Sequence, residues 1–257
     1  MNIGIMCAMK EEYIEWIPYL SDIHSYSFQQ FQITKGKVDQ NQISLILSGI
    51  GKVSAALAID YLVAKEEIDL IIVAGLAGSL DNKLQIGDIV LVDQAVAHDC
   101  WHPDFIKNWN KDIISCGSRV YKTNDFLIDT LVEATENFEL DFPERLTRIT
   151  KNKSSIIIAG AIATGDLPVL SREDISQGLL DVYPAICVDM ETAAVYQAAF
   201  LHSIPCVSVR CISDIVGHQQ SVLAIMRYVQ PLCQHLASFL SYVLPVLIEK
   251  QRKFKEG

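Results

Sequence analysis

The chain of 257 residues carries 21 Lys and Arg against 31 Asp and Glu, a formal net charge of −10, and half of its residues are hydrophobic. This apolar content excludes a disordered chain and is typical of a globular protein with a sizeable core. The acidic balance argues against a nucleic-acid-binding surface, which needs clustered Lys and Arg, but leaves a small-molecule site open.

Short β-branched runs alternate with helical patterns along most of the sequence. In chain order we predict strands at Ile3–Ala8 and Ile43–Leu47, a helix at Lys52–Lys65, strands at Leu70–Ala74 and Asp88–Ala97, a helix at Asn124–Asn137, a strand at Ser155–Ala163, a helix from Ser171 to about Leu180, a strand at Ala185–Asp189, a helix at Glu191–Leu201, a strand at Cys206–Cys211 and a helix at Ser221–Glu249. We expect the last helix to be bent or broken near Pro231 and Pro245.

This alternation predicts the α/β class, with residues 1–257 as a single three-layer α/β/α domain around a largely parallel mixed central sheet. Runs such as Leu70–Val73 are apolar at every position, as expected for strands that helices cover on both faces. Residues 99–122 are rich in Trp, Asn, Lys and Ser, and we expect them to form a long excursion at the edge of the domain.

The seven cysteines are odd in number and scattered, and no CxxC occurs, so buried free thiols in a reducing compartment are predicted. The N-terminal residues show no basic segment before an apolar stretch, which argues against a signal peptide. The late apolar run from Leu236 to Ile248 is too short to span a bilayer and contains Pro245. We therefore expect a cytoplasmic protein.

Candidate site segments follow the predicted strands, where open α/β sheets bind ligands. Four are predicted as loops and a fifth places two carboxylates at a strand-to-helix junction: Ala8–Glu12, Ser48–Lys52, Gly75–Ser79, Ser213–Gly217 and Val188–Thr192. Gly49-x-Gly51 lacks the third glycine of a dinucleotide fingerprint, and no P-loop is present. The glycines are equally well explained as tight turns, while the acidic residues suggest a site that binds hydroxyls and moves protons.

Two further features of the sequence fit either a structural or a functional role. Arg210 lies within the apolar run Val207–Ile212, so its charge needs Glu or Asp beside it, either as a structural ion pair or as part of a site. The run His98-Asp99-Cys100-Trp101-His102 resembles a set of metal ligands, but nothing nearby completes the three or four ligands that zinc requires. We interpret it as an edge-loop cluster near a substrate pocket, and predict no metal and no cofactor.

The segments taken together resemble a known family. Gly4–Glu12 resembles the opening of 5′-methylthioadenosine/S-adenosylhomocysteine nucleosidases, and Ser48–Val53 matches their SGIGKV segment. Gly75–Gly78, Gly87–Val90, Val188–Glu191 and Val209–Asp214 follow in the family's order. On these six segments the chain is identified as a member of the purine nucleoside phosphorylase/nucleosidase superfamily, with its nucleosidase branch favoured. The resemblance implies a nucleoside phosphorylase-like fold.

The resemblance also implies an activity, the hydrolysis of the N-glycosidic bond of 5′-substituted adenosines. The candidates are 5′-methylthioadenosine, S-adenosylhomocysteine and 5′-deoxyadenosine, cleaved through a ribosyl cation to adenine and the 5-substituted ribose. Asp214 matches the general acid that protonates adenine N7, with Ser213 orienting its carboxyl, and Glu12 matches the base that takes a proton from water. We expect Asp214 to be drier than an ordinary surface Asp.

Other positions match the family's substrate-binding residues. Glu191 matches the carboxylate that binds the ribose hydroxyls, and Met190 the residue that packs under the sugar. Gly78 and Val169 match backbone contacts to the purine, and Arg210 a cation that orients water. Ile50, within the SGIGKV match, is also expected to bind substrate.

Three departures leave the exact substrate open: Leu76 stands where the family usually has Ser or Thr, Asp189 where it has Glu, and Pro168 where an aromatic residue often stacks on adenine. The family pattern further implies a homodimer. In it, the 99–122 excursion would bring apolar groups such as Trp101, Pro103 and Phe105 to the neighbouring subunit's pocket.

Alternative functions are a purine nucleoside phosphorylase, a nucleosidase for another nucleoside such as futalosine, and a non-catalytic nucleoside-binding protein. Phosphorolysis needs arginines around a dianion site, but Cys7–Tyr13 and Ala74–Leu80 contain none, and Glu12 would repel phosphate. The changes at Leu76 and Pro168 keep the second alternative open. Binding alone would not require an acid and a base together.

Overall fold

Ten strands form one sheet in this computed structural model, which describes residues 1–100, 120–135, 157–217 and 228–256. The strands are β1 (Asn2–Cys7), β2 (Ser21–Phe28), β3 (Phe31–Val38), β4 (Asn41–Leu47), β5 (Leu70–Ser79), β6 (Ile89–Ala97), β7 (Val120–Lys122), β8 (Ile157–Thr164), β9 (Cys187–Asp189) and β10 (Cys206–Ile215). The α-helices are α1 (Lys10–Ile14), α2 (Lys52–Lys65), α4 (Asp125–Thr135), α6 (Gln177–Val182), α7 (Thr192–Leu201) and α9 (Val229–Glu256), with 3₁₀ turns η1 (Ile17–Tyr19), η2 (His98–Cys100) and η4 (Arg172–Asp174).

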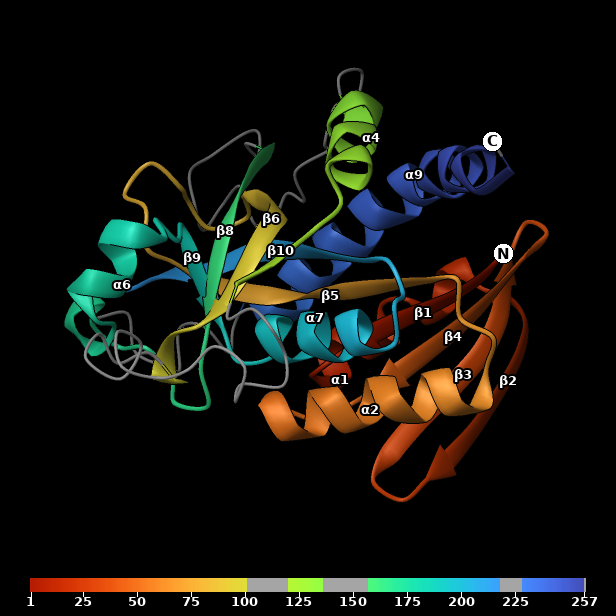
Figure 1. The fold of residues 1–257 in the computed structure, drawn as a ribbon. Helices are drawn as coiled ribbons and strands as arrows, with labels where there is room; N and C mark the ends of the chain where they lie inside the picture. The colour runs from red at the N-terminus through yellow and green to blue at the C-terminus, as the bar shows by residue number, and fades with distance from the viewer. Residues whose placement is uncertain (101–119, 136–156, 218–227, 257) are drawn as a thin grey trace.

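The sheet runs in the order β10-β6-β8-β9-β5-β1-β4-β3-β2, with β7 on β6. Because β10 also pairs with β5, the strands β5, β9, β8, β6 and β10 close into a ring, and β1 to β4 extend from it (Figure 1). Five of the strand pairings are parallel and five are antiparallel. The sheet is therefore mixed, as predicted, but only half of its pairings are parallel, so the prediction that it is largely parallel was wrong.

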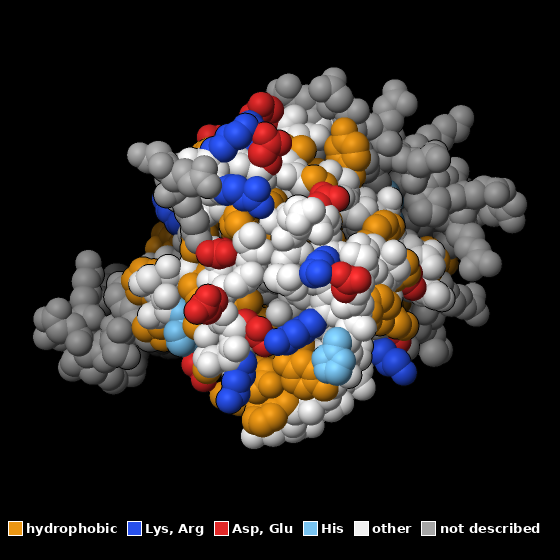
Figure 2. Space-filling view, turned by 90° about the vertical axis from the view of Figure 1, so that its right-hand side faces the viewer, with side chains coloured by type: hydrophobic (Ala, Val, Ile, Leu, Met, Phe, Trp, Pro, Cys, Tyr) orange, Lys and Arg blue, Asp and Glu red, His pale blue; other side chains and the backbone are white. Residues whose placement is uncertain are grey.

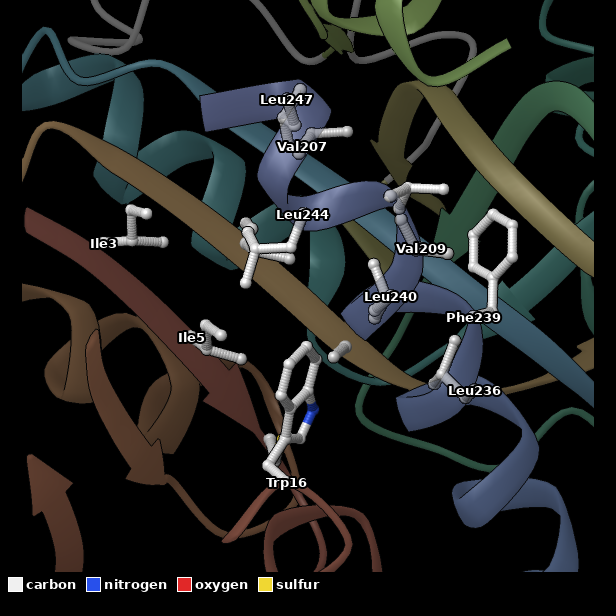
Figure 3. Packing of buried hydrophobic residues seen from close by; sticks show 14 of the residues in the cluster. Ile3, Ile5, Trp16, Val207, Val209, Leu236, Phe239, Leu240, Leu244 and Leu247 are labelled. Atoms are coloured by element: carbon white, nitrogen blue, oxygen red, sulfur yellow. The ribbon is translucent and has the colours of Figure 1, made fainter. Parts of the chain in front are cut away.

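Successive residues of β1 face opposite sides of the sheet, as the pleat requires. Ile3 and Ile5 pack in the cluster that includes α9, whereas Met6 packs in the cluster that includes α2 and α7. Figure 3 shows Leu236, Leu240 and Leu244 of α9 facing the labelled side chains of β1 and β10. Figure 1 shows α2 and α7 on the opposite side of β1 from α9. Helices thus cover both faces of this part of the sheet.

Helix α9 ends at Glu256, later than the predicted end at Glu249. It runs for 28 residues and continues through Pro245, so it is not broken there, whereas the predicted alternative of a bend stays a prediction. Pro231 lies in the first turn, where a helix does not need the missing N–H. By length and composition alone Val229–Lys253 would be long and apolar enough to cross a membrane, but 61% of that window is buried inside the protein. Its apolar side chains form core contacts instead.

The β2–β3 hairpin was not predicted from the sequence. β2 reads Ser-Asp-Ile-His-Ser-Tyr-Ser-Phe, and nearly all of it is exposed, so no buried alternation marks it as a strand.

Figure 2 views the side of the molecule where both chain ends lie. It shows Lys and Arg side chains beside Asp and Glu ones, with hydrophobic side chains gathered at the lower edge. Ile23 and Phe28 are exposed hydrophobic residues of the hairpin.

Two predicted loops are in fact strand. Gly75–Ser79 continues β5 because β10 and β9 pair with it, and Ser213 and Asp214 continue β10 along the same strand. The predicted capping box at Ser171 and Asp174 is confirmed, but it begins η4, and α6 starts only at Gln177. Predictions for residues 136–137, 155–156 and 221–227, and for Trp101, Pro103 and Phe105, lie outside the described residues.

The buried His235 of α9 makes the stability depend on pH. Burial lowers the pKa of His235 to about 4 from 6.5, although a hydrogen bond to the Gly87 backbone opposes this shift. Unfolding restores the ordinary pKa, so the unfolded chain binds the extra proton first, and stability falls as the pH drops from about 6.5 towards 4. Linkage gives a loss of about 2 kcal/mol between pH 7 and pH 5.

We expect His235→Gln, which cannot titrate, to lose that much less of its unfolding free energy between pH 7 and pH 5 than the unchanged protein. Urea denaturation of both proteins at the two pH values measures the difference. Equal losses in both would show that His235 does not cause the pH dependence.

Candidate active site

Glu12 lies in α1 with its side chain buried against the ends of β1 and β5. Its Oε2 accepts hydrogen bonds from the N–H groups of Ala8 and Met9, both at 2.9 Å, and its Oε1 accepts one from Leu76 N–H at 2.9 Å. Burial raises the pKa of Glu12, while the charge of Arg210 and the three N–H donors oppose that rise. The result is a preoriented carboxylate with elevated basicity.

Arg210, on β10, is fully buried and is paired as the sequence predicted. Its guanidinium forms an ion pair with Asp189 and lies 3.9 Å from Glu191 Oε2. Asp189 also accepts hydrogen bonds from the hydroxyls of Thr164 and Thr192, each at 2.6 Å, and from Thr192 N–H at 2.9 Å. Four donors therefore satisfy the Asp189 carboxylate, which anchors the guanidinium at the end of β9.

Gly75 allows Arg210 and Glu12 to approach β5. A Cβ atom at this position would lie 2.2 Å from Arg210 Nη1 and 2.8 Å from Glu12 Oε1. Any side chain there would therefore displace both groups. The guanidinium and the Glu12 carboxylate thus both pack against the bare backbone of Gly75. At this position the Arg210 guanidinium therefore approaches the Glu12 carboxylate.

Glu191 occupies the N-cap position of α7, without a capping side-chain hydrogen bond, and is also buried. Its Oε1 accepts a hydrogen bond of 3.0 Å from the N–H of Gly51, a residue with a φ of +102° that favours glycine. Burial, followed by the negative charge of Asp189, raises the pKa of Glu191 to about 7, against the effect of Arg210. The carboxyl therefore changes its protonation near neutral pH.

Ser213 and Asp214 lie at the end of β10, where a register shift between Ile212 and Asp214 brings Asp214 opposite Gly78 of β5. Ser213 Oγ donates a hydrogen bond of 2.6 Å to Asp214 Oδ1. A Cβ atom on Gly78 would lie 3.1 Å from Asp214 Oδ2. Asp214 is half-buried, so it is less exposed than a surface Asp but not as dry as Glu12 and Glu191.

Glu12 and Asp214 contact the same strand at different points. Glu12 binds the N–H of Leu76, and Asp214 pairs with Gly78, two residues further along β5. Two residues of a strand span about 7 Å. Met190 lies between Asp189 and Glu191 and is half-buried.

The remaining predicted residues border this group. Ile50 is exposed and precedes Gly51, whose N–H binds Glu191. Val169 is half-buried, and the carbonyl of its neighbour Leu170 accepts a hydrogen bond of 3.1 Å from Gly217 N–H, just beyond Asp214. The structure thus brings all nine predicted residues to one end of the ring of strands.

Sequence reasoning missed several residues of this site. Gly75, Thr164 and Thr192 hold the buried charges in place. Gly75 and Thr192 lie in predicted site segments, but nothing in the sequence indicated the role of any of the three, because their residue types are common. Asp189 was predicted to be one of two carboxylates at a strand-to-helix junction and to depart from the family pattern, but it was not assigned as the acidic partner that Arg210 needs.

No group of three or more His, Cys, Asp or Glu suited to a metal ion occurs among the described residues, and His102 lies outside them. A cavity of about 560 Å³ lies elsewhere, between β7, the end of α7 and the start of β10. None of the predicted site residues lines it. The site therefore consists of carboxylates, one buried cation and backbone N–H groups.

Such a group of carboxylates around one cation defines an enzyme that transfers protons at a small polar substrate. The sequence model of the Phosphorylase superfamily matches residues 2–244, and the chain belongs to this superfamily. It is 29% identical over 220 residues to the 5′-methylthioadenosine/S-adenosylhomocysteine nucleosidase of Staphylococcus carnosus, covering 86% of this chain and 89% of the relative.

Solved structures have the same fold. The nucleosidase of that name from Colwellia psychrerythraea, in complex with adenine, superposes with a TM-score of 0.80 at 26% identity, covering 96% of both chains. Futalosine hydrolase of Helicobacter pylori superposes with a TM-score of 0.79 at 24% identity, covering 95% of this chain and 97% of that one. The chain thus has the nucleoside phosphorylase-like α/β fold that the sequence predicted.

The ion pair of Arg210 with Asp189 predicts a large and local effect on stability. Asp189→Asn keeps the size of the side chain but leaves a buried guanidinium without its anchoring counter-charge. We expect the free energy of unfolding to fall by about 3 kcal/mol, the order observed when one partner of a buried pair is removed. Urea denaturation at pH 7 measures it.

Asp22→Asn is the matched control, because it removes the same charge from an exposed pair with Lys37 on the β2–β3 hairpin. We expect no measurable loss there. A similar, small effect for both variants would contradict the structural role assigned to Asp189.

Proposed function

We propose that the protein hydrolyses the N-glycosidic bond of 5′-substituted adenosines to adenine and the 5-substituted ribose. 5′-Methylthioadenosine and S-adenosylhomocysteine are the substrates that the relatives' names indicate, and 5′-deoxyadenosine is a third candidate. The observation that carries the proposal is the placement of Glu12 and Asp214 about two residues apart along β5, one buried as a base and the other bonded to a serine hydroxyl.

In this reaction Asp214, in its protonated form, gives its proton to N7 of the purine, so that the electron pair of the breaking C1′–N9 bond leaves on neutral adenine. The ribose becomes a cation-like species. Glu12, ionised, takes a proton from a water molecule whose oxygen forms the new bond to C1′. The raised pKa of Glu12 makes it a stronger base, while the charge of Arg210 and the three N–H donors favour its ionised form.

The other residues have binding roles in the proposal. Glu191 accepts hydrogen bonds from the ribose hydroxyls, Met190 packs under the sugar, and Arg210 orients the water molecule. The backbone at Gly78 and Val169 contacts the purine, and Ile50 lies beside the sugar. Glu12, Asp189 and Glu191 carry more negative charge than Arg210 balances, which favours the developing positive charge on the ribose.

Phosphorolysis fits the site less well. Arg210, the cation whose charge acts on Glu12, is already bound by Asp189 and Thr192. A phosphate dianion would also have to lie against the buried carboxylate of Glu12, which repels it. Water, which can donate a proton to Glu12, is the nucleophile that this arrangement accommodates.

We also propose that residues 1–257 form one three-layer domain, as the coverage of 96% of the Colwellia structure supports, and that the protein is cytoplasmic. The six cysteines within the described residues are all thiols rather than disulfides, and four of them are buried, as expected in a reducing compartment. Recovery in the soluble cytoplasmic fraction of cells is the expected result. Recovery in a membrane or secreted fraction would contradict the location.

A homodimer is the proposed assembly. Ile50 and the side chains of Val53 and Leu57 on α2 are each more than half exposed, and they lie beside the Gly51 N–H that binds Glu191. A second chain would cover this apolar surface. Analytical ultracentrifugation at micromolar concentration is expected to give the mass of two chains. A fully active monomer would contradict it.

The proposed hydrolysis predicts adenine release that needs neither phosphate nor metal. We expect the same turnover of 5′-methylthioadenosine with and without phosphate, and after exhaustive chelation, because water and carboxylates suffice. A coupled or ultraviolet assay for adenine measures it. Phosphate-dependent release would indicate a phosphorylase, restoration by Zn²⁺ a metalloenzyme, and cleavage of futalosine but not adenosines a different nucleosidase.

Asp214→Asn separates acid catalysis from binding. The amide can still donate a hydrogen bond to the purine, but it has no acidic proton to deliver. A positioned general acid contributes about 10²–10⁴-fold in rate, so we expect kcat to fall by at least about 100-fold while adenine binding changes far less. Steady-state kinetics and calorimetric binding of adenine measure the two effects.

Glu12→Gln should cause a comparable loss, because it removes the acceptor of the water proton, and the two losses should not add in the double variant. A loss of less than tenfold for a folded Asp214→Asn variant would show that Asp214 is not the acid.

A further inference from the structure

The pair His98 and Asp99, at the end of β6, packs against the turn that follows β8. A Cβ atom on Gly165 would lie 2.2 Å from His98 Nε2, so the buried imidazole occupies the space that a side chain at 165 would need. Asp99 Oδ2 accepts a hydrogen bond of 2.9 Å from Asp166 N–H. These two residues belong to the run that resembled a set of metal ligands, and in the structure they contact the backbone of the turn at Gly165 and Asp166.

Lys52, the first residue of α2, joins the same turn from the other side. Its ammonium donates to both oxygens of Asp99, at 2.5 and 2.7 Å, and lies 3.6 Å from Asp166 Oδ2. Its backbone N–H donates to Asp166 Oδ1 at 2.9 Å. Lys52, Asp99 and Asp166 thus form a charged clamp that joins the end of β6, the start of α2 and the turn after β8.

The clamp adjoins the proposed substrate site at two points. On one side, Lys52 follows Gly51, whose N–H binds Glu191. On the other side, Asp166 begins the segment 166–170 that contains Val169, the proposed purine contact. The far end of this segment is held as well, because Leu170 N–H and Ser171 N–H both donate to Asp174 Oδ2 at 2.9 Å.

Partial burial makes the clamp stronger than an exposed ion pair. The side chains of Lys52 and Asp99 are 17% and 27% exposed. Burial acts to raise the pKa of Asp99, but the Lys52 ammonium and the Asp166 N–H outweigh it and lower that pKa. Asp99 is therefore ionised throughout the neutral range, and the clamp does not open with a change of pH there.

We propose that Asp99 is a positioning residue for substrate binding: through Lys52 and Asp166 it fixes the Gly51 N–H that orients Glu191 and the segment that contacts the purine. The proposal rests on the proposed function, since the roles of Glu191 and Val169 belong to it. Asp99 does not touch the reacting atoms, so its loss should weaken binding of the substrate rather than slow the chemical step.

Asp99→Asn tests this inference, because the amide can still accept the hydrogen bond from Asp166 N–H but cannot pair with the Lys52 charge. We expect KM for the nucleoside and the dissociation constant of adenine to rise about tenfold, as for the loss of one charge-assisted hydrogen bond. kcat should stay within about threefold, because Glu12 and Asp214 are unchanged. Lys52→Met should have a similar effect, and the double variant should add little.

Asp22→Asn is again the matched control, with an exposed Lys partner far from the site, and should leave KM unchanged. A lower melting temperature with unchanged KM and unchanged adenine binding would show that the clamp is merely structural and would overturn the inference, as would a fall in kcat alone. If Asp99→Asn does not fold, Lys52→Met is judged by the same criteria. If the unchanged protein does not release adenine, the proposed function is wrong. If it does release adenine, but Asp99→Asn and Lys52→Met leave KM and adenine binding unchanged, only this inference is wrong.

Discussion

The buried guanidinium of Arg210 is the constraint from which the arrangement of the site follows. A charge that has left water must be paired and hydrogen-bonded, or the folded state loses several kcal/mol. Asp189 supplies the pair, and two threonines complete its hydrogen bonds. Because Thr164, Asp189 and Arg210 lie on β8, β9 and β10, satisfying one charge also ties together three strands of the ring.

The charge of Arg210 also affects the ionisation of the two buried carboxyls, Glu12 and Glu191. Burial alone would drive Glu12 and Glu191 to their neutral forms, and the charge of Arg210 counteracts this for both. The cluster still contains more acids than cations, so it is electrostatically suited to a substrate that becomes positive. In the proposed reaction, this excess of negative charge stabilises the ribosyl cation, provided that the acids are held apart by defined contacts.

Those contacts depend on β5, which Arg210, Glu12 and Asp214 all approach. Arg210 and Glu12 pack against Gly75, Glu12 accepts a hydrogen bond from Leu76 N–H, and Asp214 lies opposite Gly78. Glycines weaken an isolated strand, but here pairing with β10 on one side and with β1 and β9 on the other keeps the strand extended. The core beneath it, built from α9 against β1 and β10 (Figure 3), makes that pairing rigid.

By itself the sequence determined the α/β class, most strands and helices, and the need for a carboxylate beside Arg210, because these follow from local periodicity and the cost of a buried charge. The family motifs led to the proposal of Asp214 as the acid and Glu12 as the base. Only the tertiary structure decided that Gly75–Ser79 is strand, that β2 and β3 form a hairpin, that Asp189 is the partner of Arg210, and that His98 and Asp99 clamp a turn. Each of these depends on which segments pair or pack in the folded chain. Local residue patterns do not show such contacts, whether the residues are 21 positions apart, as Asp189 and Arg210 are, or far more, as Gly75 and Arg210 are.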